Sequence, residues 1–170
     1  MDESLPKGLS PADAATAVAL RKALAAAGRV PGAVVIAADT IVVAPGGVIL
    51  GKPADAEDAR RMLSRLSGST HSVITGVAVI DTATGARETR AVETEIVFGR
   101  MSARDIDRYV ESGEAMGKAG AYAIQETADR FVREVRGSFT NIVGLPMEAL
   151  GEMLESLERA GAEAGSGKGG

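Results

Sequence analysis

The sequence contains no cysteine and a single histidine, and these shortages remove several kinds of functional site. Without cysteine the chain has no disulfide, no thiolate nucleophile and no zinc–thiolate centre. One histidine excludes a metal site built from several imidazoles, and it excludes a pair of catalytic histidines.

Long apolar runs and aromatic residues are also scarce. No stretch approaches the roughly 18 apolar residues that a membrane span needs, and residues 1–4 lack the basic and apolar regions of a signal peptide. Aromatic residues make up 3% of the chain and hydrophobic residues 45%, so Val, Ala, Leu and Ile must build the core. These features predict a cytoplasmic globular protein that does not interact with membranes.

The chain has no excess of positive charge. Its 19 Lys and Arg residues stand against 23 Asp and Glu residues, which gives a net charge of -4. Such a chain has no long-range attraction for DNA, RNA or anionic lipid. We therefore expect no nucleic-acid partner, and a polyphosphate ligand would need a few well-placed cations or a metal ion.

Helical and extended patterns alternate along the 170 residues, which predicts an α/β fold class. We expect helices over residues 11–27, 55–66 and 102–113 and from 146 onward, and strands over 33–43, 48–50, 72–81, 87–98 and 131–135. The run 33–43 is almost wholly apolar, as in strands buried on both faces. Residues 161–170 are rich in glycine and predict a disordered tail after a single domain of residues 1–160.

Asp39 is the most informative candidate because it interrupts an apolar strand. A carboxylate there loses several kcal/mol of hydration unless water, a cation or hydrogen-bond donors compensate. It could be a functional acid or an ordinary strand-end hydrogen-bond acceptor, and spacing alone leaves both open. Lys52 in a Gly-Lys-Pro turn and Lys118 between glycines could each reach a phosphate, although most loop lysines are only solvated.

Two other polar residues invite a functional role. His71 could move protons near neutral pH, but its place between a helix and a strand favours a structural hydrogen bond. Gln125 has an amide that could recognise the edge of a pyrimidine, which presents a carbonyl and an N–H together. On the residues alone, an amide that satisfies backbone at a strand end is the favoured role. Residues 137–141 suit a pocket wall or a turn equally well.

Five segments in order resemble motifs of the Maf family of nucleotide pyrophosphatases. They are ADTIV at 38–42, GKP at 51–53, HSVITGV at 71–77, KAGAYAIQ at 118–125 and GSFTNIVGLP at 137–146. Each motif is weak alone, but their order over nearly the whole chain makes the resemblance specific. The resemblance implies a long mixed sheet with flanking helices and a central cleft, similar to inosine-triphosphate pyrophosphatases.

The resemblance also implies a reaction. Water attacks the α-phosphorus of a nucleoside triphosphate and yields the monophosphate and pyrophosphate, with Mg²⁺ or Mn²⁺ as the cofactor. Asp39 would activate the water, and Glu3 would be a second acid that helps Asp39 to hold the metal. Lys22, Lys52 and Lys118 would lie in the cleft near the phosphates, as would Glu3. Family resemblance further implies a homodimer.

Substrate preference follows from the same resemblance. Relatives acting on dTTP and UTP have Thr after the catalytic acid and Gln in the IQ motif, and Thr40 and Gln125 match both. We therefore expect hydrolysis of dTTP and UTP. Hydrolysis of modified pyrimidine nucleotides is compatible with the same two residues. These two residues disfavour an inosine-triphosphate pyrophosphatase.

The sequence departs from the family pattern at its start and near the base loop. The Ser-x-Ser-Pro-Arg-Arg turn that grips phosphates in the family occurs nowhere in the chain. Its loss would leave strand edges uncovered and remove two phosphate-binding arginines. A longer natural chain, a weakly active truncated enzyme and a non-catalytic nucleotide-binding or cell-division regulatory protein all fit this departure. Gly117 and Glu126 replace a common Asp and a common Gly.

Overall fold

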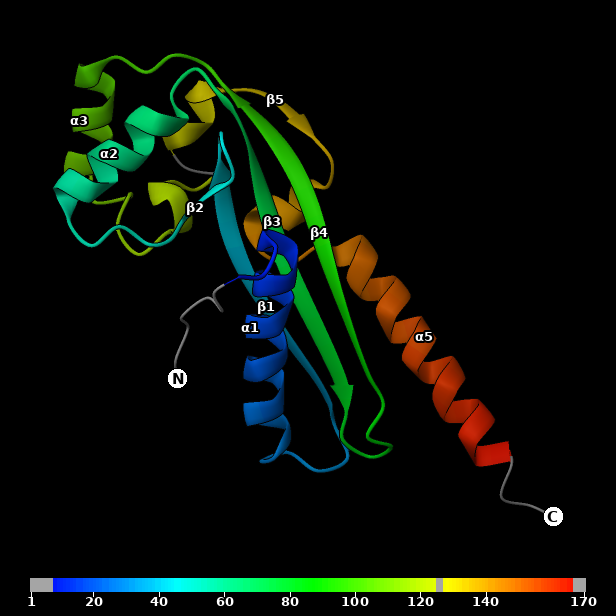
Figure 1. Ribbon diagram of the computed structural model, residues 1–170. Helices are drawn as coiled ribbons and strands as arrows, with labels where there is room; N and C mark the ends of the chain where they lie inside the picture. Colours follow the sequence, from blue (N-terminus) through cyan, green and yellow to red (C-terminus); the bar gives the residue numbers. More distant parts are fainter. Residues whose placement is uncertain (1–7, 125–126, 167–170) are drawn as a thin grey trace.

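The computed structural model describes residues 8–124 and 127–166 (Figure 1). Its helices are α1 (Pro11–Ala27), α2 (Ala56–Leu66), α3 (Ala103–Glu111), α4 (Phe139–Val143) and α5 (Met147–Ser166), with the short 3-10 turns η1 (Ala119–Ala121) and η2 (Thr127–Phe131). Its strands are β1 (Val34–Ala44), β2 (Val48–Leu50), β3 (Thr70–Asp81), β4 (Arg87–Phe98) and β5 (Val132–Arg136). The predicted elements are confirmed to within two residues at nearly every boundary. The short helix α4 is an exception, since its sequence suited a pocket wall or a turn and predicted no helix.

The strands form one sheet in the order β2-β1-β3-β4-β5. The α/β class with flanking helices is confirmed, but every strand pair among the described residues is antiparallel, where the resemblance implied a mixed sheet. Strands β3 and β4 form an antiparallel hairpin, in which Ile80 lies opposite Arg87 across the turn. The hairpin places two long strands at the centre of the sheet, with β1 beside β3.

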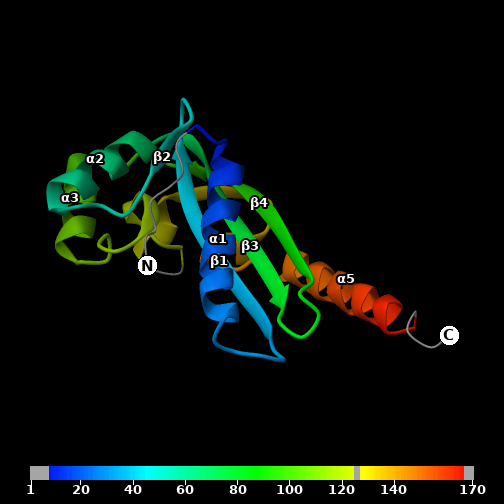
Figure 2. The same cartoon turned by 60° about the horizontal axis from the view of Figure 1, so that its bottom comes forward.

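Alternate side chains of β3 point to opposite faces of the sheet, and different helices cover the two faces. On the face that we call the α1 face, Ile74, Ala78 and Ile80 pack with alanines of α1. On the other, the α5 face, Val77 and Val79 pack with Leu150, Met153 and Leu157 of α5. Figure 2 shows α1 running along the sheet, with α2 and α3 grouped beyond one end of it. Together these layers bury β3 on both faces.

Helix α1 lies unusually close to the sheet at Gly76. A β-carbon placed on Gly76 would lie 2.3 Å from the backbone carbonyl carbon of Ala15. No side chain fits in that space, so the close approach requires glycine at this position. The buried alanines of α1 allow the same approach along the helix, because small side chains let helix and strand backbones come together.

Strand β1 is less buried than its apolar sequence predicted. Val34 is 52% exposed and Ile36 is 43% exposed, so burial on both faces is wrong for the first half of the strand. Both side chains point to the α5 face, where α5 packs over β3 and β4 rather than over β1. Within the described residues, β2 pairs only with Val42–Ala44 of β1, so residues 34–41 have a strand neighbour on one side only.

The last helix also differs from the expectation. Helix α5 continues to Ser166, so residues 161–166 are helical although their composition predicted a disordered tail. Extending an existing helix requires no new nucleation, and the alanine and glutamate residues in this segment favour helix. Within the described part of the chain, no helix is both long enough and apolar enough to cross a membrane.

Candidate active site

A cavity of about 540 Å³ opens beside the edge of β1. Its walls come from α1, β1, the β2–α2 turn, the η1 loop and α4, and it is lined in part by Lys22, Asp39, Thr40, Lys52, Lys118, Tyr122, Ile124, Ile142, Val143 and Gly144. Successive side chains of β1 alternate between the two faces, so Asp39 and Thr40 contribute to this cleft from opposite sides of the strand. Among the described residues, this stretch of β1 pairs with β3 on one edge and with no strand on the other. The cleft extends around that unpaired edge.

Asp39 is paired with Lys22 on the α1 face. The Lys22 Nζ donates to Asp39 Oδ1 at 2.8 Å, and the two side chains are 24% and 15% exposed. Asp39 lies opposite Gly76 in the β1–β3 register, where the backbone of α1 lies directly against the sheet. The position of the carboxylate therefore depends on tightly packed backbone rather than on a loop.

Lys52 and Lys118 come from two turns that are held together by a backbone hydrogen bond. The Gly120 N–H donates to the Gly51 carbonyl oxygen at 3.0 Å, so the turn before Lys52 contacts the loop after Lys118. Gly120 has φ of 70°, and a β-carbon there would lie 2.9 Å from Val42 Cγ2. Glycine is required at this position, because both the backbone conformation and the packing against β1 exclude a side chain.

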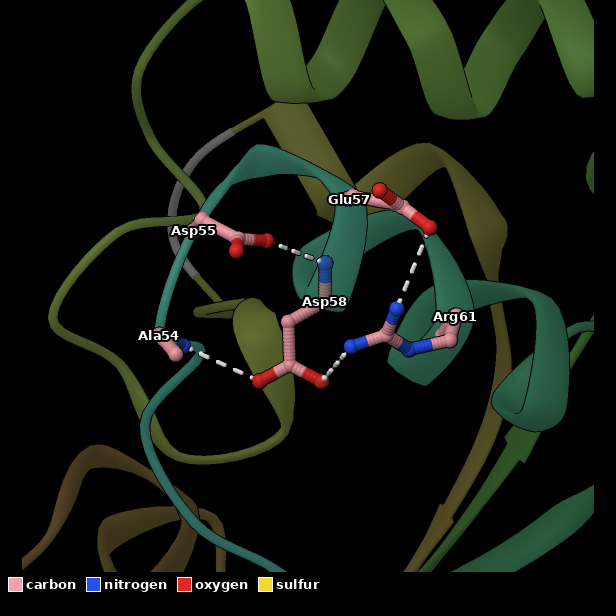
Figure 3. Close-up of polar contacts among 5 residues, drawn as sticks. All are labelled: Ala54, Asp55, Glu57, Asp58 and Arg61. Atoms are coloured by element: carbon pink, nitrogen blue, oxygen red, sulfur yellow. Dashed lines mark hydrogen bonds and ion pairs between the residues drawn. The ribbon is translucent and has the colours of Figure 1, made fainter.

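The turn that carries Lys52 leads into the capped N-terminus of α2 (Figure 3). Asp55 caps the helix by accepting the Asp58 N–H at 2.8 Å, and Asp58 Oδ2 accepts the Ala54 N–H at 3.0 Å. The hydrogen bond from Ala54 lowers the pKa of Asp58 below its ordinary value. Arg61 pairs with Asp58 and Glu57 on the outer side. This local network limits the freedom of the chain directly after Lys52.

Thr40 belongs to a chain of hydrogen bonds on the α5 face. Its Oγ1 lies 2.9 Å from Oγ1 of Thr75, its cross-strand partner on β3. Thr75 Oγ1 donates to the backbone carbonyl oxygen of Asn141 at 3.1 Å. The Asn141 amide donates to the Val73 carbonyl oxygen and to Thr94 Oγ1, each at 3.0 Å. These bonds attach α4, and with it the cleft wall at residues 142–144, to the central strands.

Tyr122 and His71 form a buried anchor beneath another wall of the cleft. The His71 Nε2 and the Tyr122 hydroxyl lie 2.7 Å apart, and Phe98 packs edge-on against both rings. Burial lowers the pKa of His71 to about 4, and burial also raises the pKa of Tyr122. His71 is 3% exposed and does not line the cleft, so it has the structural role that its sequence position favoured.

The backbone is strained at Ala121, the last residue of η1. Ala121 has φ of 62°, a left-handed conformation that costs a non-glycine residue about 1 kcal/mol or more. The next residue is the buried Tyr122, and the Ala123 N–H donates to the Tyr109 hydroxyl at 3.4 Å. The two tyrosines thus hold this wall in a conformation that the local sequence alone would not favour.

Among the described residues that line the cleft, Asp39 is the acidic side chain that could ligate a metal ion. Among the residues that the structure describes, no three His, Cys, Asp or Glu side chains lie together as a metal site. Asp39 supplies a carboxylate, which is the ligand type that Mg²⁺ and Mn²⁺ prefer. Magnesium in nucleotide enzymes commonly takes one or two carboxylates and completes its shell with phosphates and water. The single carboxylate of Asp39 fits a site of that composition.

The structure brings most of the predicted site residues together. Asp39, Thr40, Lys22, Lys52 and Lys118 all line the same cleft. Glu3 and Gln125 lie outside the described residues. Sequence reasoning missed Thr75, Asn141 and Tyr122 as supports of the cleft. Each of these three residues falls within one of the five motifs, and that membership was the available signal. Spacing alone does not distinguish a buried polar side chain from a polar side chain in a turn.

Comparison with known proteins gives consistent matches. The family model described as Maf-like protein matches residues 1–157. A dTTP/UTP pyrophosphatase of Pelotomaculum thermopropionicum is 48% identical over 157 residues, which are 92% of this chain and 82% of the relative. One from Anaeromyxobacter dehalogenans strain 2CP-C is 52% identical over 162 residues, 94% of this chain and 79% of the relative. One from Sphingopyxis alaskensis is 50% identical over 157 residues, 92% of this chain and 81% of the relative.

These matches extend over all five motifs and over the strands and turns that line the cleft. The chain spans 79–82% of the length of these three relatives. A family model that matches residues 1–157 and relatives that are about half identical lead to the same conclusion. The chain belongs to the family of Maf-like proteins.

Proposed function

We propose that the protein is a nucleoside triphosphate pyrophosphatase that hydrolyses dTTP and UTP to the monophosphate and pyrophosphate. The observation that carries the proposal is the placement of a carboxylate, Asp39, in one cleft with Lys22, Lys52 and Lys118. Relatives about half identical to the chain are named dTTP/UTP pyrophosphatases. A water nucleophile and a polyanionic substrate need this combination of a base and nearby cations.

Asp39 would accept a proton from the attacking water. The carboxylate is held on a strand that is packed beneath α1, and Lys22 fixes the direction of Oδ1. A rigidly held base keeps the water in line with the α-phosphorus, which is the positioning that phosphoryl transfer requires. The proton moves from the water to Asp39, the new bond forms between water oxygen and phosphorus, and pyrophosphate leaves with the electrons of the broken P–O bond.

Lys52 and Lys118 would contact phosphate oxygens from the turns above the cleft. The Gly120–Gly51 hydrogen bond keeps these turns together, so both lysines line one cavity. Cations held in place before the reaction stabilise the charge that develops on the leaving pyrophosphate. The net charge of -4 makes such local cations necessary.

Asp39 would also ligate a divalent cation, Mg²⁺ or Mn²⁺, with Glu3 as the second acid that the family resemblance implies. Such an ion supplies Lewis-acid polarisation of the phosphate oxygens. The residues of this chain contribute the carboxylate ligand, the orientation of that ligand by Lys22 and the surrounding cleft. Thr40 and Gln125 would set the preference for thymine and uracil nucleotides, and we further propose a cytoplasmic homodimer.

The test is pyrophosphate release by the purified chain with dTTP, UTP, CTP, GTP and ITP, in Mn²⁺ and in Mg²⁺. We expect release from dTTP and UTP, and we expect Asp39→Asn to lower kcat about 10²- to 10⁴-fold, the usual contribution of a general base. Glu95→Gln is a matched control, because Glu95 is a half-exposed strand carboxylate outside the cleft.

A folded chain that releases no pyrophosphate from any of the five nucleotides contradicts the enzymatic proposal. That result favours the alternative, a weakly active or inactive nucleotide-binding or cell-division regulatory protein. Equal losses in Asp39→Asn and Glu95→Gln would instead contradict the role assigned to Asp39. Circular dichroism on all three proteins shows whether each variant is folded.

A further inference from the structure

Residues 118–124 form one wall of the cleft, which we call the η1 wall. The residues of this wall that line the cavity are Lys118, Ala119, Tyr122, Ala123 and Ile124. The backbone between them is left-handed at Gly120, with φ of 70°, and at Ala121, with φ of 62°. Glycine adopts this conformation freely, whereas alanine does not. The η1 wall therefore keeps its shape only if contacts from other elements hold Ala121 against its own preference.

Hydrogen bonds from other elements hold the η1 wall on both sides of Ala121. Before it, the Gly120 N–H donates to the Gly51 carbonyl oxygen at 3.0 Å. After it, the Tyr122 hydroxyl lies 2.7 Å from Nε2 of His71 on β3. Strand β3 is the central strand of the sheet. The most firmly held strand thus restrains the residue that directly follows the strained one.

The His71–Tyr122 contact lies in apolar surroundings. His71 is 3% exposed and Tyr122 is 5% exposed, and Phe98 packs edge-on against both rings. Burial lowers the pKa of His71 to about 4 and raises the pKa of Tyr122, so both side chains are uncharged near neutral pH. Little water competes for a hydrogen bond in such a place, which makes this contact a directional restraint on Tyr122.

Stability alone does not account for a polar pair at this place. Among the residues that the structure describes, the Nδ1 atom of His71 has no hydrogen-bond partner. A buried polar atom without a partner lowers stability, and replacing both members of a buried pair by apolar groups of similar shape can be neutral or stabilising. The pair therefore contributes a restraint on the η1 wall rather than a gain in folding free energy.

We propose that His71 is a positioning residue for nucleotide binding, which acts through the Tyr122 hydroxyl to keep the η1 wall in the conformation that lines the cleft. His71 does not line the cavity itself, so its effect on a ligand passes through Tyr122. The inference rests on the proposed function and concerns the affinity of the same site. Asp39 and Lys22 lie on β1 and α1, outside the η1 wall, so loss of the pair should weaken binding more than the chemical step.

The first experiment compares the wild type with the double variant His71→Leu/Tyr122→Phe, which replaces the polar pair with apolar side chains. We expect KM for UTP to rise about 3- to 10-fold, the effect of one net hydrogen bond, and kcat to stay within about twofold. We expect urea denaturation to show no loss of stability, because no polar atom of the pair is left unpaired. A pair with only a structural role would instead lower stability and leave KM unchanged. An unchanged KM in the folded double variant overturns the proposal.

Single variants of His71 test the proposal without a change to Tyr122. His71→Gln keeps an amide that can bond the Tyr122 hydroxyl, whereas His71→Leu leaves that hydroxyl without its partner. We expect KM to rise in His71→Leu and to stay within about twofold of the wild-type value in His71→Gln. Equal KM values in the two variants overturn the proposal, because the hydrogen bond would then make no difference to binding.

Ser67→Ala is the matched control for a hydrogen bond outside the cleft. The Ser67 hydroxyl accepts the Met101 N–H at 2.8 Å, and neither residue lines the cavity. We expect the variant to lower stability and to leave KM for UTP unchanged. If Ser67→Ala raises KM as much as the double variant does, general loosening of the protein sets the affinity, and the role assigned to His71 is overturned.

The strain at Ala121 gives a further test. In an Ala121→Gly background the left-handed conformation no longer costs energy, so the η1 wall depends less on its restraint. We expect the double variant to raise KM by less than about twofold in this background, against about 3- to 10-fold in the wild-type background. The same rise in both backgrounds overturns the inference that the pair holds Ala121 in place.

Failure of the proposed function has a different signature. If the wild type folds but releases no pyrophosphate, calorimetry measures binding of the non-hydrolysable α,β-imido analogue of UTP to the same variants. Weaker binding to the double variant than to the wild type and Ser67→Ala supports the inference without any turnover. Equal binding to all three, or no binding to any of them, overturns it.

Discussion

The two faces of the sheet are built from different kinds of contact at the same strands. On the α1 face, Ala15 lies on Gly76 so closely that no side chain fits between them. The four buried polar residues of the described chain, His71, Thr75, Thr94 and Asn141, instead form hydrogen bonds on the α5 face. Both faces meet at the cleft, because Asp39 points to the first and Thr40 to the second.

The difference shows how one strand can separate two tasks. Close packing of backbone fixes the distance between α1 and β3 and leaves few alternatives for the carboxylate beside it. Hydrogen bonds have direction, so the α5 face can fix which way a hydroxyl points as well as where it lies. The α1 face therefore fixes the position of Asp39 by packing, and the α5 face holds Thr40 by hydrogen bonds.

The strongest test of the α1 face is Gly76→Ala. A β-carbon 2.3 Å from the Ala15 backbone must push α1 away from the sheet. We expect the free energy of unfolding to fall by about 3 kcal/mol or more, at the upper end for an overpacked core. Urea denaturation measures the change. Gly151→Ala is the matched control, since nothing lies within 4 Å of that exposed helical position, and it should be neutral or stabilising.

A loss of similar size in both glycine variants would show that the close contact at Gly76 has no special cost. The comparison between the faces would then fail on the α1 side. Nearly unchanged stability of Gly76→Ala, together with unchanged kcat, would lead to the same conclusion.

The α5 face should respond to pH through His71. Burial lowers the pKa of His71 from 6.5 to about 4, so between these values the unfolded chain binds a proton that the folded chain does not. The stability is therefore complete above pH 6.5 and is lost as the pH falls towards 4, by about 3 kcal/mol over the interval. Chemical denaturation of the wild type and of His71→Gln across pH 4–7 measures this contribution as a difference in slope.

Tyr122→Phe is the control for that difference. It removes the hydrogen-bond partner of His71 but keeps the aromatic ring and the burial. We expect Tyr122→Phe to retain the pH dependence, because burial is the cause of the lowered pKa. If His71→Gln shows the same slope as the wild type, the histidine does not cause the acid sensitivity of this face.

The cap of α2 should have the smallest effect, because it depends on neither face. Asp55 accepts one backbone N–H at 2.8 Å and lies at the surface. We expect Asp55→Ala to lower the free energy of unfolding by about 1 kcal/mol, the usual cost of losing an N-cap. Glu57→Ala, which removes only an exposed ion pair to Arg61, should change stability by less. Equal effects in thermal unfolding would show that the cap is not a special contact.

Much of the fold follows from local sequence. The boundaries of α1, the hairpin of β3 and β4 and the capping box of α3 were predictable, because each depends on residues close in the chain. The apolar run in β1 predicted a strand correctly but its burial incorrectly. Burial depends on which strands α5 covers, and that information is not local.

The sequence by itself determined the elements, the absence of cysteine chemistry and the motifs that identify the family. Those motifs also predicted Asp39, Thr40, Lys52 and Lys118 as site residues, and the wider family resemblance added Lys22. Only the tertiary structure decided that these five residues share one cleft and that Asp39 and Thr40 meet it from opposite faces. Only the structure showed that Thr40 contacts Thr75 and that Thr75 donates to a carbonyl 66 residues away in the chain. Periodicity and capping act between near neighbours, whereas a hydrogen-bond direction is set by whichever distant groups the fold brings into contact.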